Sequence, residues 1–143
     1  MSGPPVTNMH ATAVALDAQR GVLILGPSGA GKSLLALRLM ALGARLVADD
    51  RVDLWTEDGA VWARAPERLQ GVIEARGVGL LRAAALPAAQ IVLVVDLARD
   101  ETERLPPSRE HDLLGMSLPL VLRVQHGHLD AAVLQWLKGG RVA

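Results

Sequence analysis

The apolar residues of this chain form short continuous runs and one helical stretch that together predict a nucleotide-binding unit. Residues 22–25 are an uninterrupted apolar run of the kind found in buried strands, and the Leu and Ala residues of 34–40 recur at helical spacing. Gly43 suits the left-handed position at a helix end, and residues 45–48 then predict a second strand. Strand, helix and strand in this order form a crossover unit, whose carboxyl edge is where such sheets bind nucleotides.

The same patterns predict the remaining elements. Residues 1–8 are rich in Pro, Gly, Ser and Asn and predict a flexible lead-in, so that residues 9–143 form a single domain. Residues 98–114 are strongly charged and contain Pro106 and Pro107, as expected of an exposed lid. The other expected elements are hairpins of 10–16 with 22–25 and of 53–56 with 60–63, strands at 72–76, 91–95 and 118–124, a bend at 77–79, and a closing helix at 129–138.

The segment between the first buried strand and the helix fits the phosphate-binding pattern of Gly, four residues, Gly, Lys and Ser or Thr. In such a loop the glycines let backbone N–H groups turn inward around a phosphate. Lys32 reaches the terminal phosphates, and the hydroxyl of Ser33 can bind Mg²⁺. The sequence therefore predicts nucleotide binding by Gly26, Pro27, Ser28, Gly29, Ala30, Gly31, Lys32 and Ser33.

Composition narrows the class of function. Fifteen basic and fifteen acidic residues leave no net charge, and only two residues are lysines, which argues against a general nucleic-acid binder. The chain has no cysteine, which excludes disulfides, thiolate zinc sites and thiol catalysis and agrees with a reducing cytoplasm. No apolar run reaches the length of a signal peptide or a membrane span, so we expect a soluble cytoplasmic protein without a membrane partner.

Two strand ends offer the acidic group that phosphoryl transfer needs. Asp96 follows the central strand in the manner of a Walker B aspartate, whereas Asp49 and Asp50 end the strand after the phosphate-loop helix. Neighbouring side chains on a strand diverge, so one carboxylate of this pair could face the metal while the other takes a proton. Glu74 and Arg76 are two residues apart and share one face of a short strand, which suits joint binding of Mg²⁺ and phosphate.

Histidines and arginines give weaker candidates. His10, in the first hairpin, is a candidate acid or base, against the ordinary reading of a structural or solvated side chain. One arginine of the expected lid could close over the transferring phosphate, although solvated charge is the default. The lid arginines are Arg99, Arg104 and Arg109. The other histidines lack the spacing of zinc ligands, so we expect no zinc site; they are His111, His126 and His128.

Four segments together resemble the catalytic domain of the HPr kinase/phosphorylase family in order and spacing: His10, residues 26–33, residues 43–53 and residues 73–81. The resemblance implies an α/β fold like that of phosphoenolpyruvate carboxykinases, in which a P-loop lies in a mixed β-sheet with flanking helices. It implies that Asp49 is the catalytic base, assisted by His10, and that Asp50 holds the site from behind. It also places Mg²⁺ at Ser33 and Glu74, matches Arg104 to a catalytic arginine, and removes Asp96 from the candidates.

The resemblance implies an ATP- and Mg²⁺-dependent serine kinase that acts on an HPr-type phosphocarrier protein of the phosphotransferase system, with phosphorolysis as its reverse and a regulatory role in carbon and nitrogen metabolism. Two alternatives stay open: a small-metabolite P-loop kinase, and a non-catalytic nucleotide-dependent regulatory module. The chain looks like a short form without the family's N-terminal domain, and it has Ala11 and Gln125-His126-Gly127-His128 where the family has Gly and a Pro-Gly-Arg turn. The family forms hexamers, and a homo-oligomer of this shorter form is left open.

Overall fold

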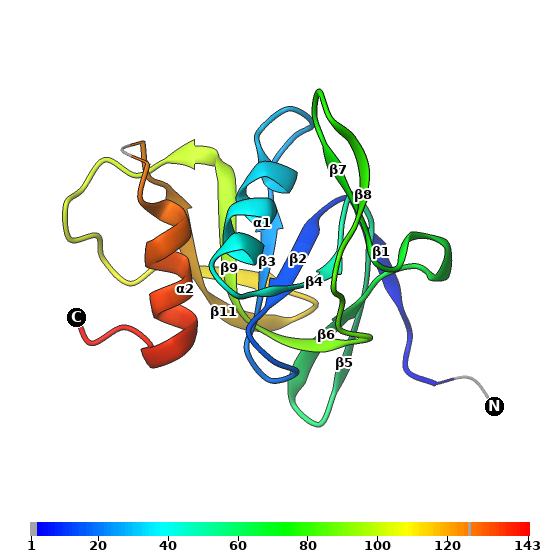
Figure 1. Ribbon diagram of the computed structural model, residues 1–143. Helices are drawn as coiled ribbons and strands as arrows, with labels where there is room; N and C mark the ends of the chain where they lie inside the picture. The colour runs from blue at the N-terminus through cyan, green and yellow to red at the C-terminus, as the bar shows by residue number, and fades with distance from the viewer. Residues whose placement is uncertain (1–2, 126) are drawn as a thin grey trace.

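The computed structural model describes residues 3–125 and 127–143, and among these residues nine strands form one strongly curled mixed sheet (Figure 1). The long strand β9 lies at its centre because it pairs with β3 and β11 in parallel and with β6 antiparallel. The strands in spatial order are β1 (Thr7–Met9), β5 (Val52–Glu57), β6 (Ala60–Arg64), β9 (Ala89–Asp100), β3 (Gly21–Leu25), β2 (Thr12–Ala15) and β4 (Arg45–Ala48), and β11 (Met116–Arg123) carries β10 (Glu110–Leu113) beside β9.

Two helices, α1 (Lys32–Ala41) and α2 (Leu129–Gly139), cover one face of this sheet in the described part of the chain (Figure 1). The sequence of β3 is apolar throughout because this strand is buried on both faces. Its Val22 and Ile24 pack in a cluster with both helices, whereas Leu23 belongs to a second cluster enclosed by the curled strands. The two clusters hold the strand that leads into the phosphate loop from both sides.

A separate hairpin of β7 (Val72–Ala75) and β8 (Gly79–Arg82) stands beside α1, on the side away from α2 (Figure 1). A short 3₁₀ turn, η1 (Glu67–Leu69), precedes it. The buried side chain of Ile73 anchors the hairpin in the cluster beneath α1. Backbone hydrogen bonds from Leu46 N to Ala84 O (3.1 Å) and from Leu86 N to Leu46 O (2.9 Å) tie the segment after β8 to β4.

The predicted mixed sheet with flanking helices is confirmed, and so are the two hairpins and the crossover from β3 through α1 to β4. The crossover is wider than expected, because β2 lies between β3 and β4 and pairs antiparallel with both. Strand β1 starts at Thr7, inside the lead-in predicted for residues 1–8, because Thr7 pairs with Leu54 of β5. Among the described helices, none has the length and apolar character needed to cross a membrane.

The lid predicted for residues 98–114 is shorter than expected. Its charged residues suggested a loop, but β9 continues to Asp100, which pairs with Arg123 of β11, and residues 110–113 form β10. Pairing with a neighbouring strand satisfies the backbone whatever the side chains are, so polar residues continue the strand at its exposed end. Residues 101–109 remain as the connection.

Gly21 provides a test of this sheet. A Cβ atom at this position would lie 2.7 Å from the carbonyl oxygen of Gln90 and 3.3 Å from the Ile91 side chain, in the strand that pairs with β3. We expect Gly21→Ala to lower the free energy of unfolding by about 1–3 kcal/mol, measured by urea denaturation, because the two strands must move apart. Gly3→Ala, where a Cβ meets nothing within 4 Å, is the matched control. Equal stability of the two variants would show that this packing is looser than the structure indicates.

Candidate active site

The phosphate loop, residues 26–33, connects the end of β3 to the start of α1. Two of its glycines show why the backbone needs this residue. Gly31 has φ 101° immediately before the helix, and Gly26 has φ 150°, where a Cβ would lie 3.0 Å from the Cβ of Ala30. A hydrogen bond from Ala30 N to Pro27 O (3.0 Å) closes the turn. The loop is thus a compact turn at the start of a helix, as phosphate-binding loops are.

Lys32 lies across the hollow of this loop. Its side chain is buried, and Nζ donates hydrogen bonds to the carbonyl oxygens of Gly26 (2.7 Å) and Pro27 (3.1 Å). These two carbonyls hold the ammonium group against the loop, and a lysine at this place in a P-loop is the one that reaches the terminal phosphates. Binding of a phosphate in the loop would therefore require Lys32 to release these two carbonyls.

Asp49 is the most connected polar side chain near the loop, and only 6% of it is exposed. Its Oδ1 accepts hydrogen bonds from Ser33 Oγ (2.6 Å) and Thr12 Oγ1 (3.1 Å). Its Oδ2 accepts one from the backbone N–H of Glu74 (3.0 Å). One carboxylate therefore joins the phosphate-loop helix, β2, β4 and β7.

Asp50 points elsewhere, because its backbone adopts the left-handed conformation (φ 71°) immediately after β4. Its side chain is 68% exposed, and its Oδ1 accepts a hydrogen bond from Nε2 of His10 at 3.0 Å. The resemblance implied that Asp49 works with His10 and that Asp50 lies behind the site. The structure has these positions the other way round: Asp49 is the buried group, and the exposed Asp50 contacts His10.

Magnesium would find oxygen ligands beside the loop, although the described residues contain no cluster of three or more His, Cys, Asp or Glu side chains suited to a metal. Mg²⁺ commonly keeps several waters and takes one or two protein ligands together with phosphate oxygens. The hydroxyl of Ser33, oriented by Asp49, fits this pattern. Glu74 is tied to the site through its backbone, and its side chain is exposed.

Asp96 and the lid arginines make other contacts. Asp96 accepts a hydrogen bond from Ala98 N (2.9 Å) and lies 3.6 Å from Nε of Arg99, so its carboxylate makes local contacts within β9. Arg109 donates two hydrogen bonds of 2.9 Å to Glu101, and this guanidinium holds the pKa of Glu101 below its ordinary value. For Arg104 the described residues show no hydrogen bond or ion pair, and the connection that carries it passes on the α2 side of the molecule (Figure 1).

The remaining histidines are not brought together with the site. His111 lies in β10 and His128 precedes α2, whereas His126 lies outside the described residues.

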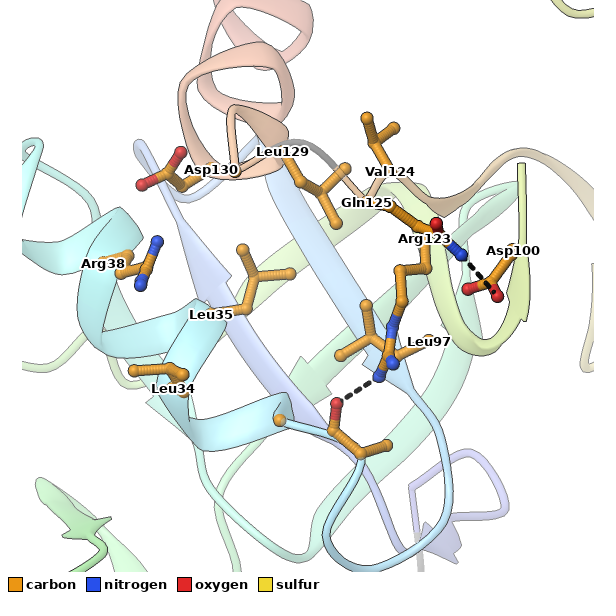
Figure 2. A pocket seen from close by; sticks show the side chains of 13 residues that line it. Leu34, Leu35, Arg38, Leu97, Asp100, Arg123, Val124, Gln125, Leu129 and Asp130 are labelled. Carbon is orange, nitrogen blue, oxygen red and sulfur yellow. Dashed lines mark hydrogen bonds between the residues drawn. The ribbon is translucent and has the colours of Figure 1, made fainter. Parts of the chain in front are cut away.

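Sequence reasoning missed two residues that support the loop. Thr12 is the hydroxyl partner of Asp49, and Arg123 donates a hydrogen bond from its guanidinium to the carbonyl oxygen of Ala30 (Figure 2). Thr12 carries a visible signal, because it is the polar residue of a buried strand that is otherwise apolar, whereas the half-buried Arg123 at the end of β11 carries none. A polar side chain at a buried strand position needs a partner, and here the partner is the site.

The chain matches the family described as HPr Serine kinase C-terminal domain over residues 4–134. It belongs to this family. Among its relatives, the HPr kinase/phosphorylase of Leptothrix cholodnii is 42% identical over 129 residues, which cover 80% of this chain and 39% of the relative. That of Streptococcus thermophilus is 38% identical over 143 residues, with 90% and 46% covered. This HPr serine kinase C-terminal domain therefore spans less than half the length of these relatives.

A solved structure agrees with the fold of this HPr serine kinase C-terminal domain. The Hpr(Ser) kinase/phosphatase from Coxiella burnetii aligns with a TM-score of 0.76 and 26% sequence identity, over 92% of this chain and 94% of that chain. The mixed α/β fold expected from the sequence is thus found in a solved member of the family.

The two neighbouring aspartates should differ in what they do for stability. Asp49→Asn replaces one accepting oxygen by an N–H₂ group that faces a donor, so we expect the free energy of unfolding to fall by about 1–3 kcal/mol in urea denaturation. Asp50→Asn is the matched control, because its side chain is exposed and Asn tolerates the left-handed backbone. A loss in Asp50→Asn as large as that in Asp49→Asn would contradict the arrangement described.

Proposed function

We propose that this chain is the catalytic unit of an ATP- and Mg²⁺-dependent kinase that phosphorylates a seryl hydroxyl of an HPr-type phosphocarrier protein. The names of its relatives support the choice of acceptor. The single observation that supports transfer, beyond nucleotide binding, is the exposed pair of His10 and Asp50, since Asp50 directly follows the aspartate that holds Ser33. A non-catalytic binding module has no need for such a pair.

The residues of the loop account for nucleotide binding. Backbone N–H groups of residues 26–33 surround the phosphates, and Lys32 exchanges its two carbonyl partners for phosphate oxygens. Asp49 keeps the Ser33 hydroxyl directed away from the loop backbone, where it can serve as a metal ligand. When bound, Mg²⁺ neutralises charge on the transferring phosphoryl group. Glu74, whose backbone is held by Asp49, is the further carboxylate that we assign to the metal.

Asp50 is the group that we assign to the acceptor. Its carboxylate is exposed to an incoming hydroxyl, and the hydrogen bond from His10 fixes its orientation. In the kinase direction Asp50 accepts or positions the hydroxyl proton, and in phosphorolysis the same carboxylate acts on phosphate and returns the proton to serine. Asp49 is unsuited to this task, because three donors already occupy its two oxygens. This assignment reverses the roles that the family resemblance implied for the two residues.

Direct phosphorylation tests the proposal. The protein is incubated with γ-labelled ATP, Mg²⁺ and an HPr-type phosphocarrier, and the labelled residue is mapped by mass spectrometry. We expect label on one serine of the carrier, and none with Lys32→Ala, which removes the cation that meets the terminal phosphates.

The alternatives give different results in the same experiment. Transfer to a low-molecular-weight acceptor, with none to the carrier, would indicate a small-metabolite kinase. Saturable ATP binding without any transfer would indicate a nucleotide-dependent regulatory module. Either result would overturn the proposed acceptor.

Asp50→Asn separates chemistry from binding. A group that handles the acceptor proton acts mainly in the transition state, so its loss lowers kcat with little effect on nucleotide affinity. We expect kcat to fall by about 10²- to 10⁴-fold, with the Kd for ATP within a few-fold of the parent. The measurements are initial rates with the carrier and calorimetric titration with ATP.

Asp58→Asn is the matched control for this variant. Asp58 is also exposed and left-handed (φ 53°), but it lies in the turn between β5 and β6. Full activity of Asp50→Asn, or an equal loss in Asp58→Asn, would remove Asp50 from the mechanism and leave His10 as the next candidate.

A further inference from the structure

A pocket of about 470 Å³ opens on the α2 side of α1 (Figure 2). Helix α1 separates it from the β7–β8 hairpin, on whose side Asp49 holds Ser33 (Figure 1). Small-molecule sites typically enclose roughly 300–1,000 Å³. The pocket therefore has room for a ligand fragment of the size of a nucleoside.

The walls of the pocket are apolar at their base and polar at their edge. Leu35, Leu97 and Leu129 line it and belong to one buried cluster. Leu34 also lines it but is 56% exposed, so a ligand could cover it. At the edge, Gln125 donates a hydrogen bond to Asp100 at 2.8 Å, and Arg38 and Asp130 lie on the opposite side (Figure 2). An apolar base with a few polar groups around it is typical of cofactor and nucleotide sites.

The pocket is continuous with the phosphate loop. Ala30 and Gly31 form part of its wall, and Arg123 fixes this part of the loop by its hydrogen bond to Ala30 O (Figure 2). In a P-loop the backbone N–H groups hold the α- and β-phosphates while the lysine reaches the β- and γ-phosphates. Ser33 faces Asp49, on the side away from the pocket, whereas its neighbour Leu34 lines the pocket.

We propose that this pocket receives the nucleoside part of the nucleoside triphosphate whose phosphates lie in the loop. The phosphate chain then runs from the His10–Asp50 pair, at the transferring end, past Lys32 to Leu34, at the nucleoside end. This inference rests on the proposed function insofar as the loop must bind a nucleotide. Beyond nucleotide binding, the inference states which side of the loop the base and ribose occupy. It also states that aliphatic contacts with Leu34 hold them there.

Equilibrium binding tests the proposal without any turnover. ATP and inorganic tripolyphosphate are titrated separately into the protein in the calorimeter, since tripolyphosphate carries the phosphates without a nucleoside. We expect Leu34→Ala to weaken ATP about 5- to 10-fold, because the nucleoside loses an apolar contact, and to leave tripolyphosphate binding within twofold of the parent. Leu42→Ala removes another exposed leucine, 48% exposed at the far end of α1, and should change neither affinity.

A second variant tests the pocket by filling it. Val124 lines its wall from the end of β11 and is half-buried, and Val124→Trp adds bulk without charge. We expect this variant to weaken ATP about tenfold or more and to spare tripolyphosphate.

The outcomes separate this inference from the function beneath it. If the parent protein binds neither ligand, nucleotide binding itself fails, and the proposed function fails with it. Two results with a parent protein that binds both ligands would overturn the pocket. In the first, both variants bind ATP as tightly as the parent does; in the second, both variants lose ATP and tripolyphosphate equally. The nucleoside then lies elsewhere, and the kinase proposal stands. Loss confined to ATP in both variants supports the pocket.

Discussion

The buried carboxylate of Asp49 is the interaction on which the candidate site depends. A charged group that is only 6% exposed needs several hydrogen-bond donors, and it finds them on three different elements: Ser33 on α1, Thr12 on β2 and the backbone of Glu74 on β7. These elements are distant in sequence, and no backbone ladder connects α1 with β7. The hydrogen bonds to this one carboxylate therefore fix the loop serine and strand β7 relative to the central sheet.

The change of backbone conformation at the end of β4 explains how two adjacent aspartates come to differ so much. In an extended strand their side chains would alternate between opposite faces. Instead Asp50 adopts a left-handed conformation, and a hydrogen bond from Arg51 N to Asp49 O (2.8 Å) closes the turn. Asp is among the few residues that tolerate this conformation, since its short polar side chain can bond locally. One carboxylate is thus buried as a support, and its neighbour is presented to solvent with His10.

Most of the fold was predictable, because burial on both faces of β3 and β9 produces continuous apolar runs and because glycines mark the turns. The phosphate loop was predictable for a different reason, because its chemistry requires particular residues at fixed spacing. The positions of Asp49 and Asp50 were not predictable from spacing: which of two neighbours is buried depends on Thr12 and on the Glu74 backbone, which reach the site only through tertiary structure. The prediction for the extent of the lid was wrong for a similar reason. The pairing of β9 with β11 continues the strand to Asp100 despite the charged residues there.

Strand β9 gives the site its direction. It pairs in parallel with β3 on one side and β11 on the other, so the carboxyl ends of all three strands meet near the phosphate loop. The end of β3 supplies the loop, and the end of β11 supplies Arg123, which holds the loop from the α2 side. Asp49 holds it from the β4 and β7 side through Ser33. A loop held from both sides has a fixed backbone, which is what the proposed arrangement needs if an acceptor group and a nucleoside are to bind at its opposite ends.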